Sequence, residues 1–117
     1  MIQRILPGKR YSEAVIVQGL IFCSGMVPEN TDADATAQTQ NVLQQIDQLL
    51  ASQGTDKSRI VDATIYLADM ADYNAMNEAW DAWVAEGDAP ARATVEARLA
   101  DPHWKVEIKV VAALSQN

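Results

Sequence analysis

The sequence predicts a single α+β domain, spanning residues 1–117, in which two helices cover one face of one mixed sheet. Segments with strand and helix periodicity follow one another in the order βββαβαββ. A chain of 117 residues is long enough to bury a core of its own. The last strand carries apolar residues on both faces, because Val110 and Val111 point in opposite directions. Two helices cannot cover both faces, so the free face is expected to meet another copy of the chain.

The N-terminal half is expected to form three short strands and one helix. The strands are predicted at 2–6, 14–19 and 20–27, with a hairpin turn at Gly19. The polar stretch "PENTDADAT" precedes a helix at about 34–53, because its Asp residues can cap a helix and complement its dipole. Gly54 is the expected stop. The apolar stripe of this helix consists of Val42, Ile46, Leu49 and Leu50, with Leu43 at its edge.

The C-terminal half adds a strand, a helix and two final strands, predicted at 59–69, 72–86, 91–99 and 104–114. Gly87 is expected to end the helix. Asp101-Pro102 separates the last two strands, and a simple hairpin centred there would pair Glu107 closer to Glu96 than to Arg92. The apolar stripe of the second helix consists of Tyr73, Met76, Trp80, Trp83 and Val84.

Composition excludes several classes of function. A net charge of −7 disfavours binding to a phosphate backbone, so no nucleic-acid partner is expected. Cys23 is the only cysteine and His103 the only histidine, which excludes an internal disulfide and a multi-histidine metal site within one chain. No membrane span or signal-peptide pattern is found, so the cytoplasm is the simplest location and no membrane partner is expected.

Charged residues alternate with apolar ones in both final strands. Arg92, Thr94 and Glu96 share one face, as do Lys105, Glu107 and Lys109. One interpretation is a solvated sheet face with charge pairs worth about 0.2–1 kcal/mol each. The other is functional. Arg92 opens its strand directly after a turn, where an arginine can hold a carboxylate, while a nearby carboxylate orients water.

Three segments carry a family resemblance: "YSEAVIVQGLIFCSGMVPEN", "DATIYLADMADYNAMNEAWDAW" and "PARATVEARLADPHWKVEIKVVAAL". Over nearly its whole length the chain resembles the RidA/YjgF family of small enamine/imine deaminases. The third segment matches the C-terminal signature of that family, in which Pro-Ala-Arg opens one strand and Val-Glu-Ile lies in the next. "VPENTDADA" and "AMNEAWDAWV" look most like the YoaB-type branch.

The resemblance implies a chorismate-mutase-like fold, assembled as a homotrimer with clefts between subunits. It also implies cofactor-free, metal-free hydrolysis of 2-imino or 2-enamino acids to 2-oxo acids and ammonium. By position, Arg92 would hold the substrate carboxylate and Glu107 would orient the attacking water. Thr94 stands where many members have cysteine, and its backbone would contact the imine nitrogen. The remaining positions that match the lining of the cleft are Tyr11, Ser24, Gly25 and Asn77.

One departure concerns the ligand. The family commonly has Gly-Pro-Tyr before the cleft tyrosine, whereas this chain has Gly8-Lys9-Arg10-Tyr11. The two added positive charges either favour a larger or more acidic ligand or simply alter a loop.

The alternative function is a non-catalytic module that binds a small carboxylate in the same cleft, because an arginine anchor would serve an enzyme and a binding module equally. Ribonuclease action has little support in the charge or the single histidine.

Overall fold

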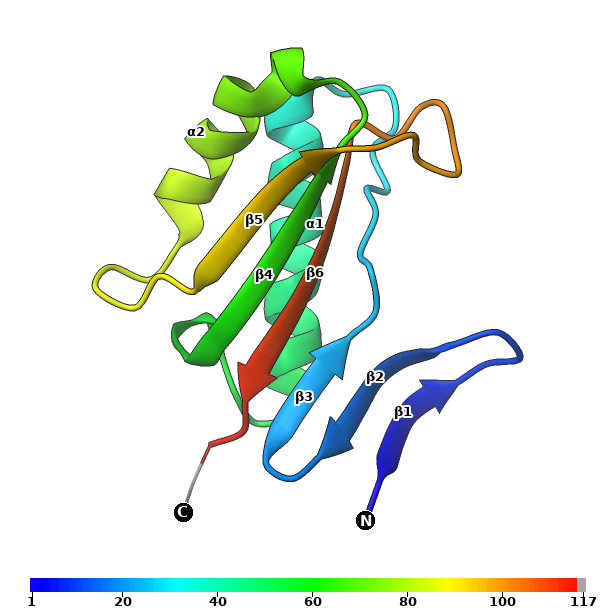
Figure 1. Cartoon of the computed structure of the whole chain (residues 1–117), viewed down its shortest axis with the longest axis vertical. Helices are drawn as coiled ribbons and strands as arrows, with labels where there is room; N and C mark the ends of the chain where they lie inside the picture. The colour runs from blue at the N-terminus through cyan, green and yellow to red at the C-terminus, as the bar shows by residue number, and fades with distance from the viewer. Residues whose placement is uncertain (116–117) are drawn as a thin grey trace.

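The computed structural model describes residues 1–115, which form one six-stranded sheet and two helices (Figure 1). The strand order across the sheet is β1-β2-β3-β6-β4-β5. Two short 3₁₀ turns, Lys57–Arg59 and Met70–Asp72, flank β4. The α+β fold and the element order that the sequence predicts are confirmed. The elements are β1 (Gln3–Pro7), β2 (Ser12–Val17), β3 (Leu20–Cys23), α1 (Ala35–Ser52), β4 (Ile60–Leu67), α2 (Tyr73–Trp83), β5 (Ala91–Glu96) and β6 (Val106–Ala113).

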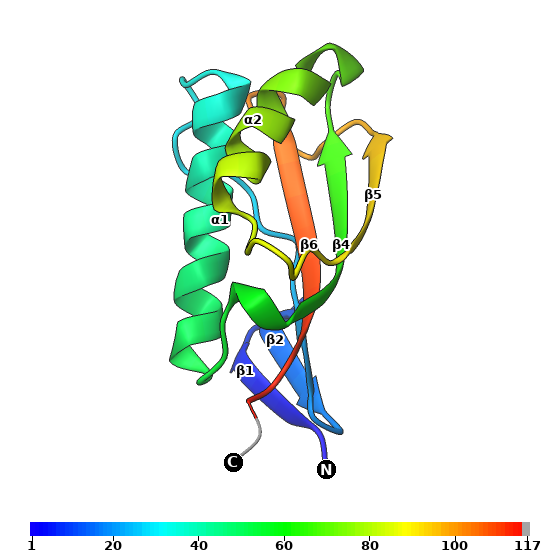
Figure 2. The same ribbon diagram turned by 90° about the vertical axis from the view of Figure 1, so that its left-hand side faces the viewer.

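Both helices lie on the same face of the sheet, as Figure 2 shows. The reason lies in the connections. β3 and β4 each run antiparallel to β6, so they are parallel to one another and α1 is the crossover between them. β4 and β5 are also parallel, with α2 as their crossover. Both crossovers step in the same direction across the sheet, and crossovers of the same hand then place their helices on one side.

The core lies between the helices and the sheet. Alternation in β6 shows this, because Val106, Ile108, Val110 and Ala112 are buried whereas Lys109 is exposed. On the other face no element covers the sheet among residues 1–115, and Phe22 and Val95 remain 38% and 41% exposed. The predicted uncovered face is therefore confirmed. Largest among the fully buried side chains are Ile21, Leu43, Ile46, Leu50, Ile65, Leu67, Met76 and Ile108.

Turn residues largely fall where the sequence places them. Gly19 has a φ of 79° in the β2–β3 hairpin, and Gly54 has a φ of 77° directly after the first helix. Asp34 caps that helix by accepting a hydrogen bond from the Ala37 amide at 2.9 Å. The second helix is shorter than predicted. It ends at Trp83 because Val84 leaves the helical region with a ψ of 139°, so Gly87 is not its stop.

The hairpin considered for the last two strands does not form. β5 pairs with β4 in parallel, with Ala63 opposite Arg92, whereas β6 inserts between β3 and β4, with Tyr66 opposite Glu107. A strand-helix-strand unit favours parallel neighbours, and β6 gains pairing on both edges by taking the central place. β5 is therefore an edge strand, and Arg92 lies at one edge of the sheet.

Candidate functional site

Arg92 is held on the helix side of the sheet by uncharged groups of α2. Its Nη1 donates a hydrogen bond to Asn77 Oδ1 at 2.8 Å, and its Nη2 lies 3.5 Å from the Tyr73 hydroxyl. Its guanidinium carbon sits 5.1 Å from the centroid of the Trp80 ring. Such stacking fixes the plane of the guanidinium without neutralising it.

No carboxylate within residues 1–115 lies within 4.0 Å of this guanidinium. The interpretation of Arg92 as one half of a structural charge pair therefore has no support in the described chain. A half-buried, oriented guanidinium with free N–H donors is chemically suited to an anion, and a planar carboxylate matches its two-pronged geometry.

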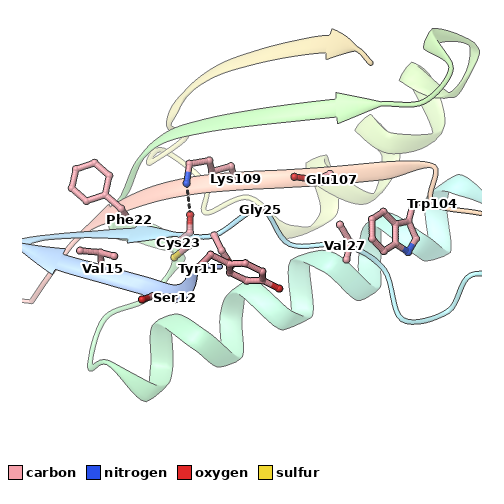
Figure 3. Close-up of a pocket in the computed structure, with 11 residues that line it drawn as sticks. Tyr11, Ser12, Val15, Phe22, Cys23, Gly25, Val27, Trp104, Glu107 and Lys109 are labelled. Carbon is pink, nitrogen blue, oxygen red and sulfur yellow. Dashed lines mark hydrogen bonds between the residues drawn. The ribbon is translucent and has the colours of Figure 1, made fainter. Parts of the chain in front are cut away.

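Glu107 lies on the opposite, uncovered face. It lines an open pocket of about 530 Å³ formed where β2, β3 and β6 meet the segment after β3 (Figure 3). No cation within the described chain pairs with Glu107, so the predicted cross-strand charge pairs are absent at this position. The pocket is lined by Tyr11, Ser12, Val15, Phe22, Cys23, Ser24, Gly25, Val27, Trp104, Glu107 and Lys109.

Gly25 places the backbone directly against the Glu107 carboxylate. Met26 pairs with Ile108 through two backbone hydrogen bonds of 2.9 and 3.0 Å, which bring the segment after β3 alongside β6. A Cβ atom at position 25 would overlap Glu107 Oε2. Glycine is therefore required here for close approach, and it fixes where the carboxylate lies.

Lys109 enters the same pocket two residues further along β6. Its Nζ donates a 2.8 Å hydrogen bond to the Cys23 carbonyl, which Figure 3 shows as a dashed line. Burial raises the pKa of the Cys23 thiol to about 11, although Lys109 acts in the opposite direction. The thiol is protonated at neutral pH, which excludes Cys23 as a thiolate nucleophile.

The structure thus divides the predicted site residues between the two faces of one sheet. Arg92, Asn77 and Thr94 lie on the helix side, and Thr94 Oγ1 is buried without a hydrogen-bond partner among the described residues. The pocket on the other face takes Glu107 together with Tyr11, Ser24 and Gly25. Tyr11 is 64% exposed. Within one chain, the structure does not bring Arg92 and Glu107 together.

Two residues of these clusters were missed by the sequence interpretation. The sequence pattern places Tyr73 in the apolar stripe of α2, but the side chain is 39% exposed and contacts Arg92. Its polar hydroxyl was the available signal. The sequence pattern gives Lys109 only as a residue of a charged face, although its spacing of two residues from Glu107 places both side chains on the same side. Through residue 115, no group of three or more His, Cys, Asp or Glu side chains is arranged to hold a metal ion.

Comparison with known proteins identifies the family. The family model described as Endoribonuclease L-PSP matches residues 1–114. The RutC family protein YoaB of Escherichia coli is 56% identical over 97% of this chain and 98% of its own. The structure of NMB1025 from Neisseria meningitidis, a member of the YjgF protein family, superposes with a TM-score of 0.95 at 56% identity, covering 100% of this chain and 98% of that one. The chain belongs to the RidA/YjgF family.

A more distant relative carries a name that describes a reaction. The chloroplastic Reactive Intermediate Deaminase A of Arabidopsis thaliana is 33% identical over 89% of this chain and 58% of its own length. The RidA/YjgF family therefore includes a protein named as a deaminase, and the YoaB-like resemblance predicted from the sequence is confirmed by the 56% identity.

Neither helix of the described residues is long and apolar enough to cross a membrane.

Proposed function

We propose that this RidA/YjgF member hydrolyses 2-imino and 2-enamino acids to 2-oxo acids and ammonium, in a cleft formed between copies of the chain. Arg92 holds the substrate carboxylate, and Glu107 orients the attacking water and takes a proton from it. The proposal needs no metal or cofactor and keeps the cytoplasmic location expected from the sequence.

One observation carries the proposal: Arg92 and Glu107 lie on opposite faces of one sheet, so both can reach one substrate only if two copies of the chain meet. Arg92 is on the edge strand β5, from where it can reach a neighbouring molecule. Glu107 is in a pocket on the face that nothing covers. Packing of a second copy across that face can bring its Arg92 to this Glu107, as a homotrimer with shared clefts requires.

The chemistry balances with these two groups and solvent. A 2-enamino acid first takes a proton from solvent at C3, so that its C2=C3 bond becomes a single bond and C2 becomes the carbon of a protonated imine. Water adds to C2 of the protonated imine, the C=N electron pair moves to nitrogen, and the Glu107 carboxylate takes a proton from the water. The resulting carboxylic acid returns that proton to the nitrogen. The C–N bond then breaks as the C2 hydroxyl forms a carbonyl, and ammonia leaves with the hydroxyl proton as ammonium. Throughout these steps, Arg92 fixes the substrate carboxylate and hence the position of C2.

The experiment that tests this proposal measures the loss of an imine that is generated in the assay mixture. An amino-acid oxidase produces 2-iminobutyrate, and the rate of its disappearance is compared with and without the protein. Acceleration by the wild-type chain, lost in Glu107→Gln, is the expected result. A wild-type protein that accelerates no imine across a range of side chains would exclude the activity.

The competing function is a non-catalytic module that binds small carboxylates. The pre-oriented Arg92, which lacks a carboxylate partner in the described chain, supports this function equally. Glu107 separates the two. In an enzyme, Glu107→Ala loses turnover but keeps affinity for a 2-oxo acid such as pyruvate. A binding module shows no imine turnover above the buffer rate in either form, and the same affinity in both.

Ribonuclease action, which the description of the family model names, has weaker support. The net charge is −7, and the only histidine is 69% exposed beside Asp101 on the turn before β6. Neither feature provides the paired acid and base, or the positive surface, that RNA cleavage would use.

A further inference from the structure

We propose that Lys109 is a second anion anchor and that the preferred substrates are 2-imino acids with an acidic side chain. This inference rests on the proposed function and adds to it a substrate class. Lys109 would bind the side-chain carboxylate while the Arg92 of a second copy binds the carboxylate next to the imine carbon.

The first support is the position of the Lys109 ammonium in the pocket. Lys109 and Glu107 lie two residues apart on β6 and point to the same side. The ammonium donates one hydrogen bond, to the Cys23 carbonyl at 2.8 Å, and it has three donors in all. No carboxylate of residues 1–115 is within 4.0 Å of it, Glu107 included. The tether to β3 therefore orients the ammonium but leaves donors free for a ligand.

The second support is the balance of charge. A dicarboxylic 2-imino acid brings two carboxylates, and Arg92 with Lys109 supplies one cation for each. A substrate with an apolar side chain would leave Lys109 without a counter-ion beside the reacting centre. Glu107 remains free to accept a proton from water, because an ion pair with Lys109 would make its carboxylate a weaker base.

The third support is the tip of the β1–β2 hairpin. The Gly8 amide donates a 2.8 Å hydrogen bond to the Tyr11 carbonyl and closes this tip, which leaves the exposed Lys9 and Arg10 as its two central residues. They line a neighbouring pocket of about 310 Å³ that shares Tyr11 with the Glu107 pocket. Glu13 lines the same pocket, so two cations face one carboxylate there. The remaining positive potential attracts an acidic substrate in a protein that is otherwise strongly negative.

The test compares two substrates in two variants. An aspartate oxidase generates 2-iminosuccinate and an amino-acid oxidase generates 2-iminobutyrate, and kcat/KM is measured for each with the full chain. Lys109→Met removes the charge and keeps the packing of the aliphatic stem. Lys57→Met is the matched control, because Lys57 lies over the Trp83 ring on the helix side and its loss changes the net charge equally.

The expected result is a fall of at least about tenfold in the ratio of kcat/KM for 2-iminosuccinate to kcat/KM for 2-iminobutyrate in Lys109→Met, as for loss of one charged hydrogen bond. The ratio should be unchanged in Lys57→Met. The inference would be overturned if the ratio of the two kcat/KM values were the same in Lys109→Met as in Lys57→Met. So would an equal loss on both substrates accompanied by a lower melting temperature, because Lys109 would then be structural.

A binding measurement keeps this inference separate from the proposed function. If wild-type protein accelerates neither imine, the hydrolase proposal fails, and calorimetric titration with oxaloacetate and 2-oxobutyrate then decides about Lys109. Tighter binding of oxaloacetate that is lost in Lys109→Met supports the second anchor. Equal affinity of the wild type for the two acids contradicts it.

Discussion

Arg92 is oriented entirely by neutral neighbours in the described chain, which distinguishes it from an arginine in a structural salt bridge. Asn77 accepts its hydrogen bond, and Trp80 stacks beneath it. A lysine cannot reproduce the planar fork that grips a carboxylate. We therefore expect the proposed carboxylate anchor to depend on the geometry of this side chain as much as on its charge.

Arg92→Lys should impair kcat/KM nearly as much as Arg92→Ala, by about tenfold to a thousandfold, because each charge-assisted hydrogen bond is worth about 1.5–3 kcal/mol. The melting temperature should change little, since no partner charge is left unpaired. Steady-state kinetics and thermal unfolding on the same preparations check this. Loss of stability with retained activity would show that Arg92 is structural.

Gly25→Ala should reduce activity through Glu107, because the new methyl group displaces the carboxylate rather than the backbone. We expect a loss of kcat of about tenfold or more, with carboxylate binding retained. A double-mutant cycle checks the route. Gly25→Ala combined with Glu107→Gln should be no slower than Glu107→Gln alone. Additive losses would mean that Gly25 acts independently of Glu107.

At the scale of elements, one buried side chain joins α1 to the start of β6. Gln38 is 0% exposed, and its Nε2 donates to the His103 carbonyl at 3.0 Å while its Oε1 accepts from the Lys105 amide at 2.8 Å. Its amide also reaches the loop before α1, at Thr31 and Ala33. This one residue therefore ties two irregular segments to the helix.

Gln38→Ala should lower the free energy of unfolding by about 2–4 kcal/mol, because it leaves buried backbone groups without partners. Gln40→Ala is the control, since Gln40 is exposed on the same helix and should change stability by less than about 0.5 kcal/mol. Denaturant titration measures both. Equal stability of the two variants would contradict the role of Gln38.

The pattern of elements was predictable because each carries a local signal, such as the stripe in α1 and the positive-φ glycines at 19 and 54. The parallel pairing of β4 with β5 was missed, because Asp101-Pro102 suggested a turn between paired strands. The strand-helix-strand order was the stronger signal. The contact between Gly25 and Glu107 was not predictable from either segment, since it depends on a bridge between Met26 and Ile108 outside the regular pairing of β3.

At the scale of the whole molecule, the uncovered sheet face and the divided site lead to the same expectation. A free chain exposes Phe22 and Val95 on one face and separates Arg92 from Glu107. Assembly would both cover the face and complete the site.

Light scattering should give a mass near three times the 12.8 kDa of the chain. A monomer at assay concentration would contradict the shared cleft.

Mixing two inactive variants tests the shared site most directly. Arg92→Ala and Glu107→Gln are unfolded together in equal amounts, refolded, and assayed for hydrolysis of 2-iminobutyrate, with each variant refolded alone as control. In randomly mixed oligomers, a site with both native groups needs a native Arg92 from one chain and a native Glu107 from the next. That combination occurs in about one quarter of sites, so we predict about a quarter of wild-type activity. No recovery, in a sample that mass spectrometry shows to contain mixed oligomers, would contradict a site built from two chains.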